Sequence, residues 1–164
     1  RQEREMLAPL REKAYCIDSS AMNSQQLRYA VQQWLKVERE GLLVVFESFG
    51  FKYGVPTDID FLFDMRSLPN PYYDTALRPF NGTEEPIRQY LDSQPLVQEM
   101  VGGIKRFIGR WLPRMQEESR SYVTVGIGCT GGQHRSVYVC ERLAEHFRLD
   151  YQVLVRHRQL NLGA

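Results

Sequence analysis

Short apolar runs and amphipathic stretches alternate along most of this chain. Residues 42–46 and 61–65 are apolar runs of strand length, and 122–128 is a third. Such runs are typical of strands that are buried on both faces of a sheet. Residues 95–117 instead repeat apolar side chains every three or four positions, which predicts a long amphipathic helix, and a shorter helix is expected over about 85–92. The buried face of the long helix is expected to hold Val97, Val101, Ile104, Ile108, Trp111 and Leu112.

The C-terminal third contains a strand, a glycine-rich loop and a helix, in that order. The loop covers residues 128–136 and follows the apolar run at 122–128. A helical pattern begins near Gln133, and a last strand is predicted at 151–155. A helix between two strands implies a right-handed βαβ unit and therefore parallel pairing. The predicted fold class is α/β, with a central, mainly parallel sheet flanked by helices. The apolar face of this helix is expected to hold Val137, Val139, Cys140, Leu143, Ala144 and Phe147.

The first forty residues do not complete a domain by themselves. A short strand is expected at 14–18, and a helix capped by Ser24 is expected over roughly 25–38. These two elements have no sheet of their own, and a polar break follows at 38–41. A length of 164 residues agrees with one domain plus a fragment of another.

Composition excludes several classes of protein. There are 21 Lys and Arg against 20 Asp and Glu, so the chain is not a polycation. No apolar run approaches the ~20 residues that a membrane span needs, so we expect no membrane partner. Cys16, Cys129 and Cys140 are an odd number without metal-type spacing, which predicts a reducing, cytoplasmic location and no bound metal.

The glycine-rich loop is the best candidate for a binding site. It leads into a helix N-terminus, where unpaired N–H groups and the helix dipole favour an anion. Two glycines allow the backbone to approach a ligand closely, and an arginine offers a planar fork for phosphate. The alternative is a tight turn followed by a solvated arginine. The predicted phosphate or phosphosugar ligands are Thr130, Gly131, Gly132, His134 and Arg135.

Two basic clusters are candidates for contact with RNA phosphates. Lys105 and Arg106 lie on the long helix with Arg110 and Arg114, and Arg156-His157-Arg158 lies near the C-terminal end. Phosphate contacts dominate such affinity, so a local patch would be required. The alternative for each cluster is an ordinary solvated surface. The predicted RNA-binding residues are Lys105, Arg106, Arg156 and Arg158.

The same loop also matches an enzyme signature. The pattern Cys129-x5-Arg135-Ser136 resembles the signature loop of protein tyrosine phosphatases. In that chemistry a thiolate attacks phosphorus while backbone amides and the arginine hold the oxyanion. Gly128 stands where that family usually has His, and only Asp64 or Asp74 is offered as the general acid. Cysteine-dependent phosphate-ester hydrolysis is therefore kept as an alternative.

A second resemblance covers the whole chain. Residues 45–56, 63–71 and 126–136 closely resemble the bacterial RapZ/YvcJ family. This resemblance implies that residues 1–39 are the last strand and helix of a P-loop kinase-like domain plus a linker. It implies that 40–164 are the C-terminal α/β domain. The chain has no Gly-x4-Gly-Lys-Ser/Thr motif, so ATP or GTP would belong to the missing N-terminal domain and no cofactor is expected here.

The resemblance also implies a function that is regulatory rather than catalytic. It implies an RNA-binding RNase adapter, acting as a homo-oligomer, that presents a small regulatory RNA to RNase E. Its C-terminal domain would sense glucosamine-6-phosphate and so control amino-sugar synthesis. Asn70 and Tyr72 would close the ligand site, although the family has His at the second position and ends in a basic cluster that is absent here. A YvcJ-type regulator without a small-RNA partner and a purely structural oligomerisation domain remain as alternatives.

Overall fold

The computed structural model of this protein describes residues 24, 27, 41–57, 59–118 and 120–160. The chain divides into two compact units, residues 1–40 and 41–164. In the first unit only Ser24 and Leu27 are described, and both are helical. The strand predicted at 14–18, Cys16 and the rest of the helix predicted over 25–38 lie outside the described residues.

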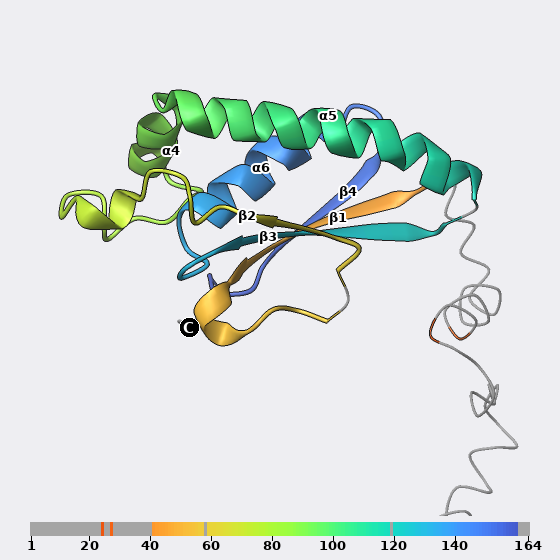
Figure 1. Ribbon diagram of the computed structural model, residues 1–164, viewed down its shortest axis with the longest axis horizontal. Coiled ribbons are helices and arrows are strands. Elements are labelled where there is room, and N and C mark those ends of the chain that lie inside the picture. The colour runs from red at the N-terminus through yellow and green to blue at the C-terminus, as the bar shows by residue number, and fades with distance from the viewer. Residues whose placement is uncertain (1–23, 25–26, 28–40, 58, 119, 161–164) are drawn as a thin grey trace, which may run out of the picture. The chain divides into compact units, whose positions relative to one another are not determined.

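The second unit is built on a parallel sheet of four strands. These are β1 (Leu43–Gly50), β2 (Phe61–Asp64), β3 (Tyr122–Cys129) and β4 (Gln152–His157). Their order is β2-β3-β1-β4, and every neighbouring pair is parallel (Figure 1). The α/β fold and its parallel sheet are therefore confirmed.

Strand β1 ends four residues beyond its apolar run, which ended at Phe46. Glu47 and Ser48 interrupt the run, yet both are fully buried. Their partners explain this, because arginines of β4 and of the residue just after it pair with Glu47, and the ring of His157 hydrogen-bonds Ser48. The extension pairs Gly50 with Cys129, so β1 and β3 both end beside the glycine-rich loop.

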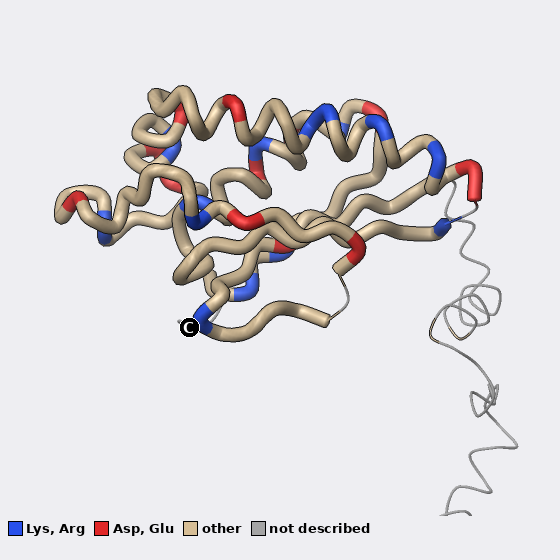
Figure 2. Tube along the Cα trace, viewed as in Figure 1, with Lys and Arg blue, Asp and Glu red and all other residues tan. Residues whose placement is uncertain are grey.

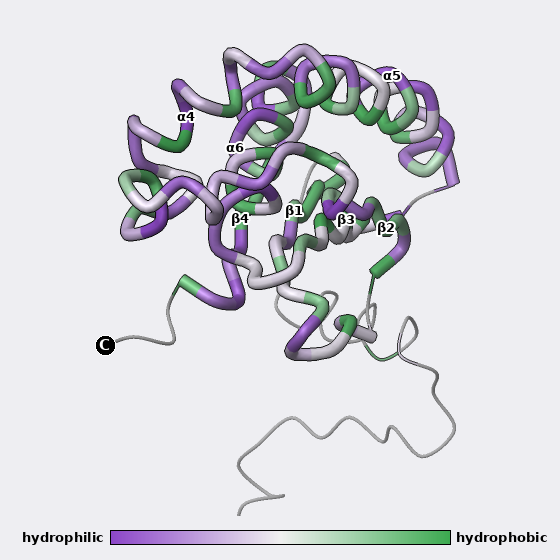
Figure 3. Tube along the Cα trace, turned by 60° about the vertical axis from the view of Figure 1, so that its left-hand side comes forward, coloured by the Kyte–Doolittle hydropathy of each residue, from purple (hydrophilic) through white to green (hydrophobic). Residues whose placement is uncertain are grey.

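Three helices cover one face of the sheet (Figure 1). They are α4 (Glu85–Asp92), α5 (Pro95–Glu117) and α6 (Arg135–Phe147). Along α5 hydrophobic positions recur once per turn (Figure 3), and all five aliphatic residues of the predicted face are buried. Trp111 is the exception, since its side chain is partly exposed and packs beside Phe107 instead of entering the core. All six residues predicted for the apolar face of α6 are buried.

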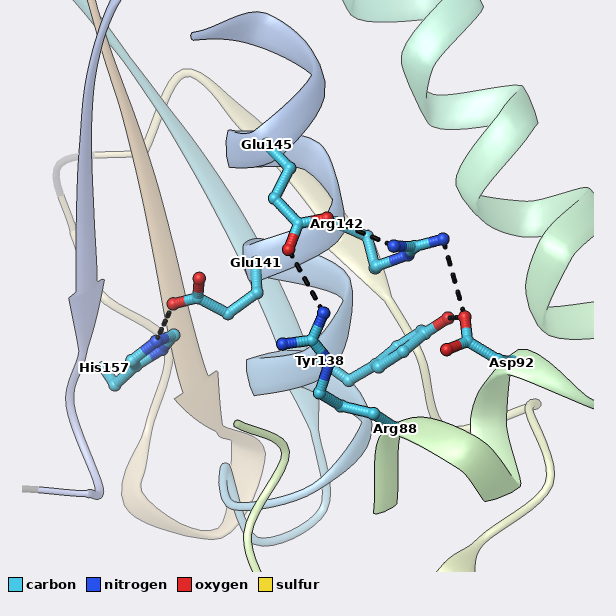
Figure 4. Close-up of polar contacts among 7 residues, drawn as sticks. All are labelled: Arg88, Asp92, Tyr138, Glu141, Arg142, Glu145 and His157. Atoms are coloured by element: carbon cyan, nitrogen blue, oxygen red, sulfur yellow. Dashed lines mark hydrogen bonds and ion pairs between the residues drawn. The ribbon is translucent and has the colours of Figure 1, made fainter. Parts of the chain in front are cut away.

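Polar contacts fix α6 to its neighbours (Figure 4). The hydroxyl of the buried Tyr138 donates to Asp92 of α4 at 2.5 Å, and Arg142 pairs with the same carboxylate at 3.6 Å. On the other side of α6, Glu141 lies 2.9 Å from Nε2 of His157 in β4. Burial and the neighbouring carboxylate raise the pKa of Tyr138, which keeps its hydroxyl proton available for this bond. The start of α6 is therefore held from both sides.

Candidate anion-binding site

Three loops converge at the carboxyl ends of β1, β2 and β3. The backbone N–H of Lys52 donates to the carbonyl of Thr130 at 3.3 Å. From the other side, Nη1 of Arg135 donates to the carbonyls of Arg66 and Leu68, both at 2.9 Å. Ligands of parallel α/β sheets bind at this edge, because strand ends and helix N-termini meet there.

The glycine-rich loop folds tightly around a buried thiol. Gly132 has a φ of +71°, a left-handed conformation that favours glycine, and its N–H donates to Sγ of Cys129 at 3.2 Å. The hydroxyl of Ser136 lies 3.1 Å from the same sulfur. Helix α6 begins at Arg135, two residues later than expected, so His134 occupies the position just before the helix.

The guanidinium of Arg135 is not exposed to solvent. Its side chain is 4% exposed, and both carbonyl contacts use Nη1. Nη2 approaches the hydroxyl of Thr130 at 3.4 Å, and Nε has no partner among the described residues. Covalent geometry places Nε–H and one Nη2–H along the same edge of the guanidinium, which is the pair that binds a phosphate or carboxylate side-on. Buried carbonyls thus anchor one side of Arg135 and leave the other side for an anion.

His134 supplies a second buried polar atom without a partner. The residue is 8% exposed, and its Nε2 atom and Nε of Arg135 are the buried side-chain atoms without a hydrogen bond in the described part of the chain. Such a group costs about 1–3 kcal/mol when it is left unpaired. Two of them on consecutive residues, beside a glycine-rich loop, indicate a site that is completed by a polar ligand.

His134 also predicts how stability depends on pH. Burial lowers its pKa, although hydrogen bonds to the backbone of Phe80 and Arg78 oppose the shift. The unfolded chain therefore binds a proton more readily than the folded one. The contribution of His134 to the free energy of unfolding is complete above about pH 6.5 and is lost as the pH falls. We expect the free energy of unfolding in urea to decrease from pH 7.5 to pH 5.5, by no more than about 1.4 kcal/mol per pH unit.

The matched comparison is His134→Gln against His146→Gln, since His146 is exposed on α6. His134→Gln should flatten the profile and His146→Gln should leave it unchanged. An equal slope in all three proteins would contradict the assignment.

Two further cations flank the loop and were not predicted. Lys52 follows β1 and contacts the loop backbone, while Arg66 follows β2 and lies 4.0 Å above the ring of Phe51. Arg66 also forms a fork with Asp64, and its hydrogen bonds lower the pKa of that carboxyl group. Asp64 is therefore ionised at neutral pH.

A proline-rich segment, residues 68–86, lies beside the glycine-rich loop through its first residues. Asn70 caps a short 3-10 helix, η2 (Pro71–Tyr73), by accepting the N–H of Tyr72 at 3.3 Å. It is two residues from Leu68, whose carbonyl is bound by Arg135. The ring of Tyr72 is half exposed and packs under the guanidinium of Arg78. The aromatic residues of this segment thus have defined positions.

The four predicted RNA-binding residues do not form one patch. Lys105 and Arg106 lie on α5, in the helical layer. Arg156 and Arg158 alternate with His157 on and after β4, so they point to the opposite face of the sheet. There both pair with Glu47, whose side chain is 1% exposed. The pairing was not predicted, because Glu47 is 109 and 111 positions away from the two arginines in the sequence.

Two negative findings apply to the described residues only. Within that part of the chain, no group of three or more His, Cys, Asp or Glu side chains is arranged to hold a metal ion. None of its helices is both long enough and apolar enough to span a lipid bilayer.

Fold and site together define a parallel α/β domain with a candidate anion-binding loop at a helix N-terminus. The model of the RapZ C-terminal domain family matches residues 42–161, and the chain belongs to this family. It is 69% identical over 159 residues to a nucleotide-binding protein of Neisseria gonorrhoeae, covering 97% of this chain and 56% of that protein. A nucleotide-binding protein of Ralstonia nicotianae is 52% identical over 162 residues, covering 99% and 55%. The chain thus spans about half the length of the curated relatives it matches.

Proposed function

We propose that this domain senses a phosphorylated amino sugar, with glucosamine-6-phosphate as the ligand, and serves a regulatory rather than a catalytic protein. The observation that carries the proposal is the pair of buried polar atoms without partners, Nε of Arg135 and Nε2 of His134. A phosphate at the start of α6 would accept from Nε of Arg135 and from the protonated ring of His134, together with backbone N–H groups of the loop. Asn70 and Tyr72 would close the sugar side.

Calorimetry with glucosamine-6-phosphate tests the site. Arg135→Ala should weaken binding at least tenfold, because a charge-assisted hydrogen bond is worth about 1.5–3 kcal/mol. Since Arg135 also holds two carbonyls, Thr130→Val provides a second variant that leaves those anchors in place and should also bind less tightly. Arg148→Ala, an exposed residue beyond α6, is the control. Equal affinities in all four proteins, or equal binding of unphosphorylated glucosamine, would refute the proposal.

The wider role we propose is that of an RNase adapter. In this proposal the full-length protein binds a small regulatory RNA, presents it to RNase E in the cytoplasm and acts as a homo-oligomer. The relatives are named nucleotide-binding proteins, and ATP or GTP would be bound by the N-terminal region that lies beyond this chain. Membership of the RapZ family supports this role. The YvcJ-type alternative lacks only the RNA partner.

An electrophoretic shift with a structured small RNA, repeated at rising salt, tests the RNA interaction. Binding should weaken steeply with salt, because each neutralised phosphate releases counterions. Replacing both Lys105 and Arg106 by alanine should reduce the slope of log affinity against log salt by about two. No shift at low salt would remove the RNA role and leave the metabolite site standing.

Phosphate-ester hydrolysis is the second candidate, favoured by the contacts of Cys129 with Ser136 and with the N–H of Gly132. The ionised Asp64 argues against it, since the reaction needs a protonated general acid. An aryl phosphate assay separates the two functions. Turnover that Cys129→Ser abolishes would overturn the regulatory proposal, and no turnover in either protein agrees with it.

A further inference from the structure

Strand β2 is an edge of the sheet with apolar side chains exposed around it. Among the described residues it pairs with β3 alone. In a parallel strand, alternate residues direct their N–H and C=O groups away from the paired neighbour. The outer side of β2 therefore offers backbone donors and acceptors to a further strand.

Exposed apolar side chains flank this edge on both faces of the sheet. Leu62, on the face away from the helices, is 43% exposed. On the helical face, Phe107 and Trp111 of α5 are 43% and 39% exposed. Phe107 packs edge-on against Phe61 and Phe63 of β2, with ring centroids 5.4 and 5.8 Å apart. A strand added beside β2 would cover apolar surface both above and below the sheet.

The same side of α5 is positively charged. Phe107, Arg110, Trp111 and Arg114 have the three- and four-residue spacing that places side chains on one helical face. Figure 2 shows basic residues recurring along α5. No ion pair within the described ranges engages Arg110 or Arg114, and Arg114 packs over the ring of Trp111 at 5.7 Å. The nearest acid of β2, Asp64, is already paired with Arg66.

We propose that the outer edge of β2 and the adjoining face of α5 form a docking site for an extended, acidic and apolar segment of a partner protein. The segment would add as a strand beside β2, place alternate apolar residues against Phe107, Trp111 and Leu62, and pair its carboxylates with the two arginines. This surface is separate from the anion-binding loop and goes beyond the proposed function.

Charge and ring packing select this occupant over two others. A second copy of the chain would bring the same unpaired arginines toward one another, at an electrostatic cost. A single-stranded RNA would need open ring faces for base stacking. Here two phenylalanines abut the ring of Phe107, and a guanidinium lies over that of Trp111. The free strand edge itself is a feature that a peptide backbone matches and a nucleic acid does not.

Fluorescence anisotropy of labelled peptides tests the proposal on the full chain. One peptide alternates glutamate with valine over nine residues, and the control peptide alternates lysine with valine. The acidic peptide should bind at least tenfold more tightly. Reversing both charges, with Arg110→Glu and Arg114→Glu together, should invert this preference. The double variant Arg88→Glu and Arg148→Glu makes the same charge change on α4 and just after α6, away from this surface, and should preserve it.

Trp111→Ala should weaken binding of the acidic peptide about tenfold without lowering the midpoint of thermal unfolding, because the side chain is partly exposed. No difference between the peptides, or equal effects of the two charge-reversed pairs, would overturn the proposal. A concentration-dependent dimer that Trp111→Ala dissociates would also overturn it. The same holds if an oligouridylate displaces the acidic peptide and its own binding requires Trp111.

Discussion

Replacing Arg156 and Arg158 together by alanine is expected to destabilise the domain by about 3 kcal/mol. Both arginines pair with the carboxylate of Glu47, which lies in the middle of the sheet and is almost completely buried. Removing them leaves an uncompensated charge on the central strand. Urea unfolding followed by circular dichroism measures the loss as a lower midpoint.

A substitution at Glu47 separates the effect of the unpaired charge from that of lost packing. Adding Glu47→Gln to the double variant should recover most of the lost free energy of unfolding, because a neutral amide needs no cation. Arg88→Ala removes a cation from an exposed pair with Glu145 and should cost less than about 1 kcal/mol. A triple variant no more stable than the double variant would show that Glu47 is not the reason for the loss. The result also matters for RNA work, since weaker binding after substitution at 156 or 158 requires a stability control.

Gly82→Ala is expected to cost about 3 kcal/mol and to weaken anion binding. Gly82 accepts no side chain because a Cβ atom there would collide with the backbone of His134 and Tyr138 in the first turn of α6. Its N–H donates to the carbonyl of Gln133 at 2.8 Å. A methyl group must push the proline-rich segment away from the residues that form the anion site. The midpoint of thermal unfolding should fall by about 10 °C, and affinity for glucosamine-6-phosphate should fall with it.

Gly103→Ala is the matched control for this substitution. Gly103 lies inside α5, and a Cβ atom there would meet nothing within 4 Å. Alanine is the better helix former by about 0.8–1.0 kcal/mol, so this variant should be more stable than the parent. If both glycine substitutions changed stability equally, close packing at Gly82 would not be the cause.

The sequence predicted the fold well where periodicity decides the structure. The bounds of α4 and α5 agree with the apolar pattern, because each helix buries one face in the hydrophobic core. The prediction was wrong where tertiary partners override local character. Buried polar residues extend β1 beyond Phe46, and Trp111 stays at the surface although its spacing suggested the core. Neither outcome can be read from a residue's own hydropathy.

For the candidate site, the sequence predicted which residues take part but not the contacts that they make. The loop and its helix were predicted from the strand–loop–helix pattern. The anchoring of Arg135 on the carbonyls of Arg66 and Leu68 was not, because those partners lie more than sixty positions away in sequence. The contact of Gln159 was not predicted either. Its side-chain oxygen accepts a hydrogen bond from the N–H of Gly50 beside the loop. Contacts made by backbone groups leave little trace in a sequence.

The order of the strands has a consequence for how this domain is made. β1 is the first strand of the second unit to be synthesised, yet it lies in the interior of the sheet between β3 and β4. Its residue Leu43 pairs with Tyr122 and Gln152, which are 122 − 43 = 79 and 152 − 43 = 109 positions later. Such distant pairing slows folding, because a long loop must close before any contact compensates for it. During translation β1 must therefore remain unpaired at least until β3 has left the ribosome, a period in which an apolar strand is exposed to aggregation and to chaperones.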